Sequence, residues 1–284
     1  MPYRVRPSFG YPYRTGSSAA IQFFFKIVPR GEGLDHMNLL FEMINSIACI
    51  IFIVINTILW GSVSVTSVVY SPSGRVAHFC MRWWSKTTLW FCRVKVDVDG
   101  LEHVSRDRVQ IFASNHASHF DIFVLSAVLP VKFGWVSKKI LFFVPFLGWH
   151  MKLQGYVSID RGNRASAIKS LDEAAEKIKG GNRIAIFPEG TRTRSGELQP
   201  FKKGLFHLCV KTGVPIVPIF INGTYGILRP ESLAVHPATV YVKIGSELPT
   251  AAYSPERIED LMNDLMARFI ELRKEAEEKR VRWS

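Results

Sequence analysis

The sequence predicts an α/β protein with a mostly parallel or mixed central sheet, flanked by helices, and an N-terminal membrane-associated helical segment. Two observations lead to this prediction. From about residue 93 onward, short apolar runs typical of strands alternate with helix-like segments. Before them, no Asp, Glu, Lys or Arg occurs between Glu42 and Arg75. We therefore expect a basic, disordered arm (1–36), a membrane-associated helical segment (37–92) and an α/β domain (93–284).

The apolar segment has the run "IACIIFIVINTILW", residues 47–60, at its centre. A transmembrane helix needs about 20 mainly apolar residues, and this region supplies them. A buried core helix is the alternative. We favour membrane insertion because the run is apolar on all faces.

The stretch that follows, residues 75–96, predicts a second helix at the membrane interface. Trp83, Trp84 and Trp90 alternate there with Arg82 and Lys86. Such a mixture of aromatic rings and cations suits the headgroup region of a bilayer. A full span and a helical hairpin in one leaflet explain the two helices equally well.

Six strands are predicted in the α/β domain. They are the runs Val94–Val98, Val109–Ala113, Tyr156–Asp160, Arg183–Phe187, Pro215–Ile221 and Val240–Ile244.

Three of the intervening or following segments have helix signals. The first begins at a capping Asn163, carries a stripe of Ile168, Leu171, Ala175 and Ile178, and ends at Gly180. Another runs from about Lys203 to Lys211 and stops at Gly213. The last spans about Pro255–Glu278, with Ser254 as N-cap and Pro255 in the first helical position.

Composition restricts the partners. The 284 residues carry a formal net charge of +12, which favours anionic partners such as anionic lipid, a phosphorylated substrate or nucleic acid. No G-x-G-x-x-G or Walker A loop is present, which argues against a nucleotide cofactor. The cysteines, Cys49, Cys80, Cys92 and Cys209, form no C-x-x-C pair, so we expect buried free thiols.

The stretch "SNHASHFD", residues 114–121, is the first candidate site. Ser118 and Asp121 have the spacing of a capping-box variant before a helix that ends at Pro130. Alternatively, a turn after the strand brings His116 back onto Asp121, and the carboxylate then orients the imidazole as a general base. His119 has the weaker claim, and we expect it to be a solvated first-turn residue. A His/His/Asp metal site lacks the usual ligand spacing.

A second candidate is "FPEGTRTRSG", residues 187–196, directly after a predicted strand. Ligands of open α/β sheets bind at the carboxyl ends of strands. Gly190 permits close approach of the backbone, and Arg192 and Arg194 offer guanidinium groups to a phosphate. Glu189 is a salt-bridge partner or an anchor for a substrate hydroxyl. Arg161, in "GYVSIDRGNR", either serves the same anion or lies in a surface turn.

Together these segments resemble the glycerolipid acyltransferase family, which includes 1-acyl-sn-glycerol-3-phosphate acyltransferases. The motifs that carry the resemblance are "NHASHFD", "GYVSIDR", "FPEGTR" and the apolar "VPIVPI" at 214–219, with "SKKILFFVPFLGW" at 137–149 between them. All occur in the family's order over roughly residues 90–250.

The resemblance implies an activity and a set of roles. His116, oriented by Asp121, would deprotonate the hydroxyl of a lysophospholipid acceptor, which would attack the thioester of acyl-CoA or acyl-carrier protein. Arg161 and Arg192 would hold the acceptor's phosphate, in a pocket shaped by Glu189, Gly190 and Thr191. "VPIVPI" would be a strand near the acyl or acceptor site. No metal, other cofactor or nucleic acid is expected.

The family's function also implies a location. We expect the inner (cytoplasmic) membrane, with the catalytic domain on its cytoplasmic side and membrane lipids as partners. The motifs leave the acceptor open between 1-acyl-sn-glycerol-3-phosphate and another lysolipid such as lyso-ornithine lipid. Two further hypotheses are a noncatalytic binder of anionic lipid, which does not explain "NHASHFD" and "FPEGTR" together, and a hydrolase in which the His/Asp pair activates water.

Overall fold

A seven-stranded sheet forms the centre of the fold in the computed structural model, which describes residues 36–71, 73–160 and 164–283. The strand order is β1-β7-β6-β2-β5-β3-β4. Every neighbouring pair is parallel except β6 and β7, which are antiparallel. The predicted α/β class with a mixed sheet is therefore confirmed. The strands are β1 (Val94–Asp99), β2 (Ile111–Ser114), β3 (Gly134–Lys138), β4 (Val157–Ile159), β5 (Ile184–Ile186), β6 (Ile216–Asn222) and β7 (Ala238–Ile244).

The six predicted strands are present, with ends shifted by one or two residues, but the sequence did not predict β3. Only Trp135 and Val136 of its sequence "GWVSK" are buried. The strand therefore lacks the long apolar run by which the other strands were predicted. The strand lies between β5 and β4 and takes its place from pairing with both. Tertiary context, more than local pattern, thus defines this strand.

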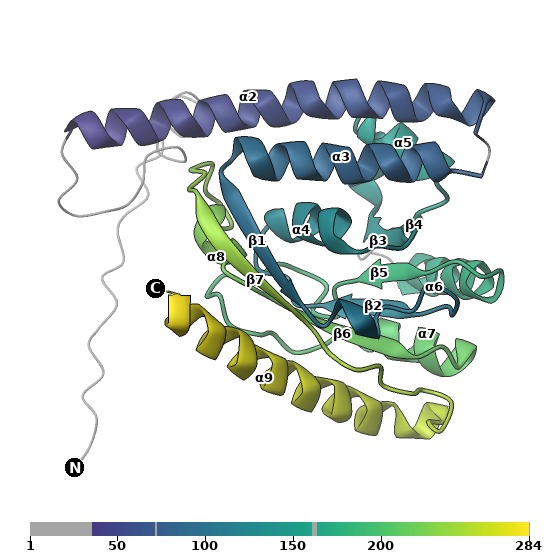
Figure 1. Ribbon diagram of the computed structural model, residues 1–284. Helices are drawn as coiled ribbons and strands as arrows, with labels where there is room; N and C mark the ends of the chain where they lie inside the picture. Colours follow the sequence, from purple (N-terminus) through teal and green to yellow (C-terminus); the bar gives the residue numbers. More distant parts are fainter. Residues whose placement is uncertain (1–35, 72, 161–163, 284) are drawn as a thin grey trace, which may run out of the picture.

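Helices cover both faces of the sheet (Figure 1). Helices α2, α3 and α4 lie on one side and α6, α7 and α9 on the other, with α9 drawn in yellow along the lower face. The longer helices are α2 (His36–Thr66), α3 (Arg75–Phe91), α4 (Phe120–Val128), α5 (Leu147–Leu153), α6 (Arg164–Lys179), α7 (Gly204–Thr212) and α9 (Ile258–Trp283), and short turns of helix are η1 (Ser67–Val69), η2 (Leu101–His103), η3 (Lys139–Phe143), α8 (Thr224–Ile227) and η4 (Pro255–Arg257).

The side chains of the central strands alternate between two hydrophobic cores, one on each face of the sheet. In β2, Phe112 points into the cluster below α3 and α4, whereas Ile111 and Ala113 belong to the cluster that packs on α7 and α9. Successive side chains of a strand point to opposite faces, so a strand buried on both sides reads as a continuous apolar run. The central strands β2, β5 and β6 are accordingly buried over almost their whole length.

Two details of the predicted helices change, and a third lies outside the described residues. Ile168 is exposed, so its place in the apolar stripe of α6 was wrong, and Ser170 and Ala174 are buried instead. The predicted cap, Asn163, lies outside the described residues. The predicted interfacial helix over 75–96 also extended too far, because α3 ends at Phe91 and β1 begins at Val94.

The other helix signals hold. Helix α7 stops at Gly213, which takes a left-handed φ of 66° that glycine adopts without steric cost. Ser254 is the N-cap of the short turn η4, with Pro255 in its first position, although no side-chain hydrogen bond caps this end. Helix α9 follows from Ile258 and runs to Trp283, beyond the predicted end at about Glu278.

Helices α2 and α3 lie side by side (Figure 1) and are joined by polar contacts in an otherwise apolar interface. Asn56 of α2 donates to the carbonyl oxygen of Trp84, at 2.9 Å, and to Oγ1 of Thr88, at 3.0 Å. The Thr87 hydroxyl donates back to the Asn56 side chain. These bonds satisfy a buried amide and fix the two helices against each other. All four cysteines are buried and free, as predicted.

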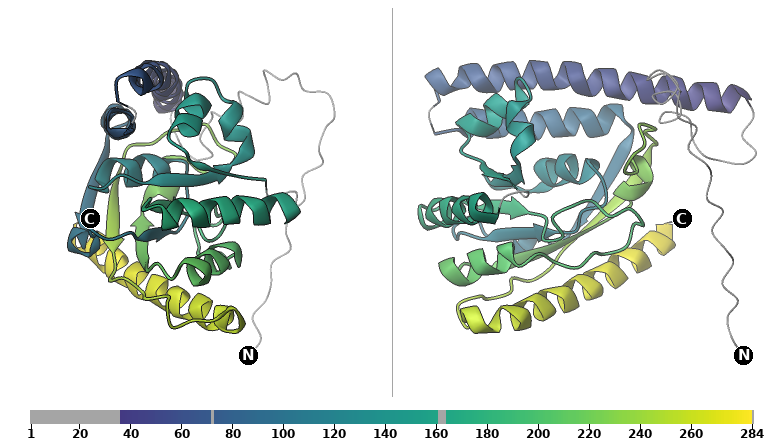
Figure 2. Two further views of the ribbon diagram at one scale, coloured as in Figure 1. Left: turned by 90° about the vertical axis from the view of Figure 1, so that its right-hand side faces the viewer. Right: turned by 180° about the vertical axis from the view of Figure 1, so that it is seen from behind.

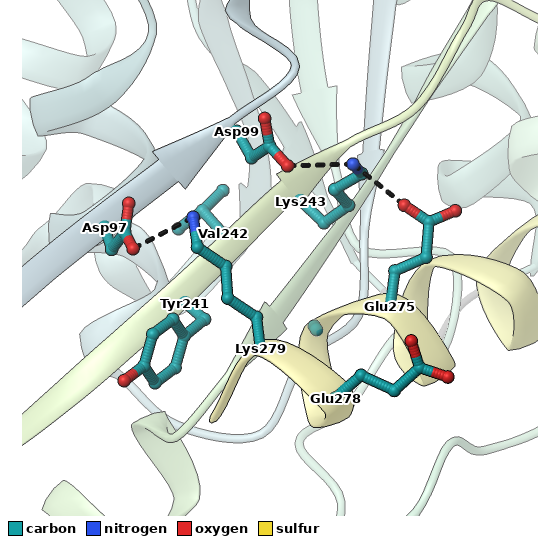
Figure 3. Close-up of a pocket in the computed structure, with 9 residues that line it drawn as sticks. Asp97, Asp99, Tyr241, Val242, Lys243, Glu275, Glu278 and Lys279 are labelled. Carbon is teal, nitrogen blue, oxygen red and sulfur yellow. Dashed lines mark hydrogen bonds and ion pairs between the residues drawn. The ribbon is translucent and has the colours of Figure 1, made fainter. Parts of the chain in front are cut away.

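Ion pairs attach the far end of α9 to the edge of the sheet (Figure 3). Lys243 of β7 lies between Asp99 of β1 and Glu275 of α9, at 2.9 and 2.8 Å. Lys279 of α9 reaches Asp97 of β1 at 2.9 Å. Ion pairs thereby connect α9 to both β1 and β7.

Candidate functional site

The two candidate loops leave the sheet side by side. Strands β2 and β5 are parallel neighbours, with Ala113 opposite Ile186, so the segments that follow them emerge at the same edge. Strand β6 pairs parallel with β2 on its other side and ends there too. Carboxyl ends of adjacent strands are where open α/β sheets bind ligands. The fold therefore brings "NHASHFD", "FPEGTR" and the end of the "VPIVPI" strand together.

His116 and Asp121 contact each other through their side chains. Nδ1 of His116 lies 2.8 Å from Oδ2 of Asp121, and the Asp121 side chain is fully buried. The His116 residue sits on the turn after β2, and Asp121 sits in the first turn of α4, so the chain folds back as the spacing required. A carboxylate on Nδ1 holds the ring in the tautomer that leaves Nε2 as an acceptor.

Asp121 also organises the turn itself. Its Oδ2 accepts the backbone N–H groups of Ala117, at 2.7 Å, and Ser118, at 2.8 Å. The bond to Ser118 is the reciprocal half of a capping box. The capping and orienting interpretations of Asp121 therefore hold together in one carboxylate.

Two residues near this pair were missed by sequence reasoning. The Thr224 hydroxyl, at the start of α8, donates to Oδ1 of Asp121. Asn115 uses both ends of its amide on Ile221 of β6, accepting its N–H at 2.7 Å and donating to its carbonyl oxygen at 2.9 Å. Asn115 belongs to "NHASHFD", so the motif was a signal for it, whereas Thr224 had no signal in the sequence.

Glu189 joins the second loop to the first. Its Oε1 accepts the backbone N–H of His116, at 2.8 Å, and its Oε2 accepts that of Gln199, at 3.1 Å. The side chain is buried, and this burial raises the pKa of the Glu189 carboxyl to about 7. A second bond runs from the N–H of Thr193 to the carbonyl oxygen of His116. Glu189 is thus bonded to backbone groups, which neither of its expected roles included.

The aromatic ring of Phe187 packs against one face of the His116 imidazole. Phe187 stacks on His116 with ring centroids 3.8 Å apart and planes 7° from parallel. Trp135 of β3 stacks on the other side of Phe187 at 5.3 Å. With Asp121 at one ring nitrogen and Phe187 on one face, the imidazole of His116 has a defined position and direction.

Arg192 is the unpaired cation of the second loop. Arg194 pairs with Glu231 at 3.2 Å, and Lys203 pairs with Glu259. Among the described residues, the partly buried Arg192 guanidinium has no hydrogen-bond or ion-pair partner. Partial burial lowers its pKa, against the opposing charge of Asp121. An unpaired, partly desolvated guanidinium beside the His/Asp pair is a ready site for an anion.

The remaining predicted residues have different positions. Gly190 takes a φ of 76°, which favours glycine, and its backbone turns the loop between Glu189 and Arg192. Thr191 is exposed beside it. Arg161 lies outside the described residues. Within the described part of the chain, no three His, Cys, Asp or Glu side chains gather closely enough to hold a metal ion.

A large apolar cavity of about 680 Å³ lies next to the His/Asp pair. His119 and Phe120, which lie between His116 and Asp121 in the chain, line the cavity, and it continues between α2, α3, β3 and α5. His119 has surface exposure, but burial lowers the pKa of its imidazole to about 4, so it is not the solvated residue that was expected. Its walls are almost entirely aliphatic and aromatic side chains, so it offers a volume for a hydrocarbon chain.

Comparison with known proteins agrees with this geometry. The acyltransferase family model matches residues 95–222. The chain is 30% identical to a 1-acyl-sn-glycerol-3-phosphate acyltransferase of Cocos nucifera, over 83% of this chain and 76% of that protein. It is 32% identical to the enzyme of that name from Limnanthes douglasii, over 75% of each chain.

A solved structure shares the fold. The crystal structure of the 1-acyl-sn-glycerophosphate (LPA) acyltransferase PlsC from Thermotoga maritima superposes with a TM-score of 0.76 and 25% sequence identity, covering 86% of this chain and 98% of that one. The family match covers the loops after β2 and β5 and ends with the last residue of β6. The chain is therefore an acyltransferase and belongs to the 1-acyl-sn-glycerol-3-phosphate acyltransferase family.

Proposed function

We propose that this enzyme transfers a fatty acyl group from a thioester donor to the free hydroxyl of 1-acyl-sn-glycerol-3-phosphate, giving phosphatidic acid for phospholipid synthesis. The observation that carries the proposal is the His116–Asp121 pair, which lies beside the unpaired Arg192 and next to the apolar cavity. A base, an anion site and a hydrocarbon volume match the hydroxyl, phosphate and acyl chains of these substrates. The names of the relatives support the same acceptor.

In the proposed mechanism His116 acts as a general base. Its Nε2 takes the proton of the acceptor hydroxyl while the oxygen attacks the thioester carbonyl carbon. The carbon–sulfur bond then breaks, and the imidazolium returns the proton to the departing thiolate. Asp121 holds the ring through Nδ1 and stabilises the imidazolium. A positioned general base contributes typically ~10²–10⁴-fold to the rate.

The phosphate of the acceptor binds to Arg192 and, in the proposal, to Arg161. Gly190 and Thr191 lie in the same loop as Arg192, half-buried and exposed respectively, while Glu189 ties this loop to His116 through the backbone N–H that it accepts. A guanidinium group contacts a phosphate with two parallel hydrogen bonds, which orients as well as binds it. The acceptor hydroxyl is thereby directed toward His116.

The proposed donor is acyl-CoA or acyl-carrier protein, both of which present an acyl thioester on an anionic carrier. The net charge of +12 favours either. We place the enzyme at the inner (cytoplasmic) membrane with its catalytic domain in the cytoplasm. Helix α2 supports membrane association, because residues Leu40–Val69 are long and apolar enough to cross a membrane. Helix α3 packs on α4 of the α/β domain as well as on α2, and this attachment to the domain favours the one-leaflet hairpin over the full span.

The test is acyl transfer by purified variants supplied with labelled donor and 1-acyl-sn-glycerol-3-phosphate. His116→Ala should lose activity by at least about a hundredfold, whereas His207→Ala, at an exposed position on α7, should remain close to wild type. Wild-type transfer by His116→Ala would overturn the mechanism. A panel of other lysolipids, including lyso-ornithine lipid, decides the acceptor, and free fatty acid released without an acceptor would instead indicate a hydrolase.

A further inference from the structure

A basic, apolar surface lies outside the two N-terminal helices, on the segment formed by η3 and α5 (residues 139–153). Five large apolar side chains of this segment are exposed, and Phe143 is the most exposed at 66%. They are Ile140, Phe143, Val144, Trp149 and Leu153. Exposed apolar side chains gathered on one short segment of an enzyme domain mark an interaction surface.

Lysines accompany these apolar groups. Lys139 and Lys152 are exposed on the same segment, with Lys138 exposed at the end of β3 just before it, and Nζ of Lys152 lies 5.6 Å from the centre of the Phe143 ring. Helix α3 shows the same combination, since Lys86 lies over Trp83 at 5.7 Å. Aromatic rings flanked by lysines are typical of side chains at the boundary between hydrocarbon and anionic headgroups.

The segment is continuous with the apolar face of α2. Helix α5 packs on α2, where Oγ of Ser64 lies 2.6 Å from Nδ1 of His150 and Gly61 faces Phe146. Viewed along α2 in Figure 2, α3 and the short teal helix α5 flank it on opposite sides, at the end of the molecule away from α9. The three elements therefore form one side of the protein.

The apolar cavity opens between these elements. Val54 and Ile58 of α2 and Val144 after η3 line the cavity and are also exposed at the surface. Its opening is therefore bordered by side chains from α2 on one side and from the η3–α5 segment on the other. If this opening faced water, a contiguous apolar patch would be exposed to solvent. A lipid leaflet over the opening would cover that patch.

We infer that the η3–α5 segment is a third membrane-contacting element, which enters the same anionic leaflet as α2 and α3 and places the cavity opening within the lipid. This inference rests on the proposed function, because it concerns an acceptor that resides in a leaflet. It predicts that Phe143, Val144 and Trp149 lie in the hydrocarbon boundary and that Lys139 and Lys152 meet anionic headgroups. The acceptor's chain then passes sideways from the leaflet into the cavity.

The experiment measures lipid contact at single positions of the full chain. Phe143→Cys and, as a matched control, Ile270→Cys on the exposed face of α9 are each labelled with an environment-sensitive fluorophore; the four native cysteines are buried. The probes are vesicles of phosphatidylcholine and phosphatidylglycerol that carry a quencher in the acyl region. Quenching and a blue shift at position 143, with neither at position 270, are expected. Vesicle binding without quenching at position 143 would overturn the inference, whatever partner covers the segment instead.

A second measurement separates membrane contact from catalysis. Lys139→Glu and Lys152→Glu should each weaken binding to the anionic vesicles by roughly fivefold or more, with no change on phosphatidylcholine alone. The double variant Ile140→Asp/Phe143→Asp should lose acyl transfer to acceptor in vesicles but keep it with a short-chain acceptor dissolved in water. Equal loss with both acceptors would contradict the inference. If the wild-type enzyme transferred no acyl group to any acceptor, the proposed function would fail while the quenching result still stood.

Discussion

Thr224 and His116 bind the same carboxylate from opposite sides. The Thr224 hydroxyl donates to Oδ1 of Asp121, and the His116 ring contacts Oδ2 at 2.8 Å. Thr224 and Asp121 are both fully buried, and 103 residues separate them in the chain. The junction between β6 and α8 therefore orients the proposed base without touching it.

We predict that Thr224→Val lowers kcat by about tenfold and leaves KM nearly unchanged. Valine keeps the shape of the side chain but leaves Oδ1 of Asp121 buried without a donor, and a hydrogen bond to a charged group contributes ~1.5–3 kcal/mol. A factor of ten in rate corresponds to about 1.4 kcal/mol. Steady-state kinetics measures the effect, and Thr224→Ser, which keeps the hydroxyl, should restore most of the activity. A folded Thr224→Val enzyme with wild-type kcat would disprove the positioning role.

Glu189 makes the stability of the enzyme depend on pH near neutrality. Burial raises the pKa of its carboxyl to about 7, from an ordinary value of 4.5. The folded protein thus binds this proton more tightly than the unfolded chain does. The contribution of Glu189 to the free energy of unfolding is complete below pH 4.5 and is lost as the pH rises through about 7.

Glu189→Gln should therefore flatten the pH dependence of unfolding between pH 4.5 and about 7. The same variant should be less stable than wild type at the acid end, by about 1–3 kcal/mol, because its amide can accept only one of the N–H groups of His116 and Gln199. Denaturant unfolding at a series of pH values measures both effects. Glu278→Gln, an exposed change on α9, serves as the control. An unchanged pH profile in Glu189→Gln would show that another group titrates.

The sequence predicted the parts of the fold in which local pattern and burial agree. Strands β2, β5 and β6 are buried on both faces and read as apolar runs, and Gly213 marks the end of α7 through its backbone conformation. Strand β3 escaped prediction because the neighbouring strands impose its conformation. Ile168 was misplaced because helical spacing alone does not say which of two adjacent stripes faces the core.

The same distinction between local pattern and tertiary context applies to the candidate functional site. The contact between His116 and Asp121 followed from a short spacing across one turn, which a local argument can resolve. Thr224 lies far along the chain and reaches Asp121 only because β6 pairs with β2, so no local pattern pointed to it. The backbone bonds of Glu189 likewise depend on the pairing of β2 with β5. Motif residues were thus predictable individually, whereas their partners depended on strand order.

We predict that Lys243→Met lowers the free energy of unfolding by about 0.5–1 kcal/mol at neutral pH, because the pairs it makes are partly exposed. The hydrogen bond that Lys243 donates to Asp99 lowers the pKa of that carboxyl, and the bonds that Lys243 donates to Glu275 and Asp99 raise its own pKa. The stabilisation from Asp99 is present above its ordinary pKa of 3.8 and lost as the pH falls through the lowered value. That from Lys243 is lost as the pH rises through its raised pKa.

Thermal or denaturant unfolding at two salt concentrations tests this attachment of α9 (Figure 3). The difference between wild type and Lys243→Met should shrink at high salt, which screens exposed charges, and in acid, where Asp99 is protonated. Lys274→Met, which removes an exposed lysine of α9 outside the Asp99–Lys243–Glu275 pairs, should change little. A difference that persists in acid would point to lost packing of the lysine stem.

Gly61 of α2 lies where any side chain would meet Phe146. A Cβ on Gly61 would approach Cβ of Phe146 to 2.7 Å, closer than real Cβ atoms pack. Phe146 cannot yield easily, because it forms a tight turn with φ 62° and ψ −55°, closed by the N–H of Leu147 on the carbonyl oxygen of Pro145 at 2.7 Å. A γ-turn of this sign is already strained.

Gly61→Val should therefore separate α2 from α5 and distort the cavity that both helices line. Valine has a higher helix propensity than glycine, so the substitution does not weaken α2 as a helix. A loss of activity would therefore come from the contact with Phe146. We expect acyl transfer to fall by about tenfold or more with long acyl chains and less with short ones, since an overpacked contact costs ~1–3 kcal/mol. Val63→Leu, which adds one methylene on the exposed face of α2, should leave transfer unchanged. Equal losses for every chain length would place the damage outside the cavity.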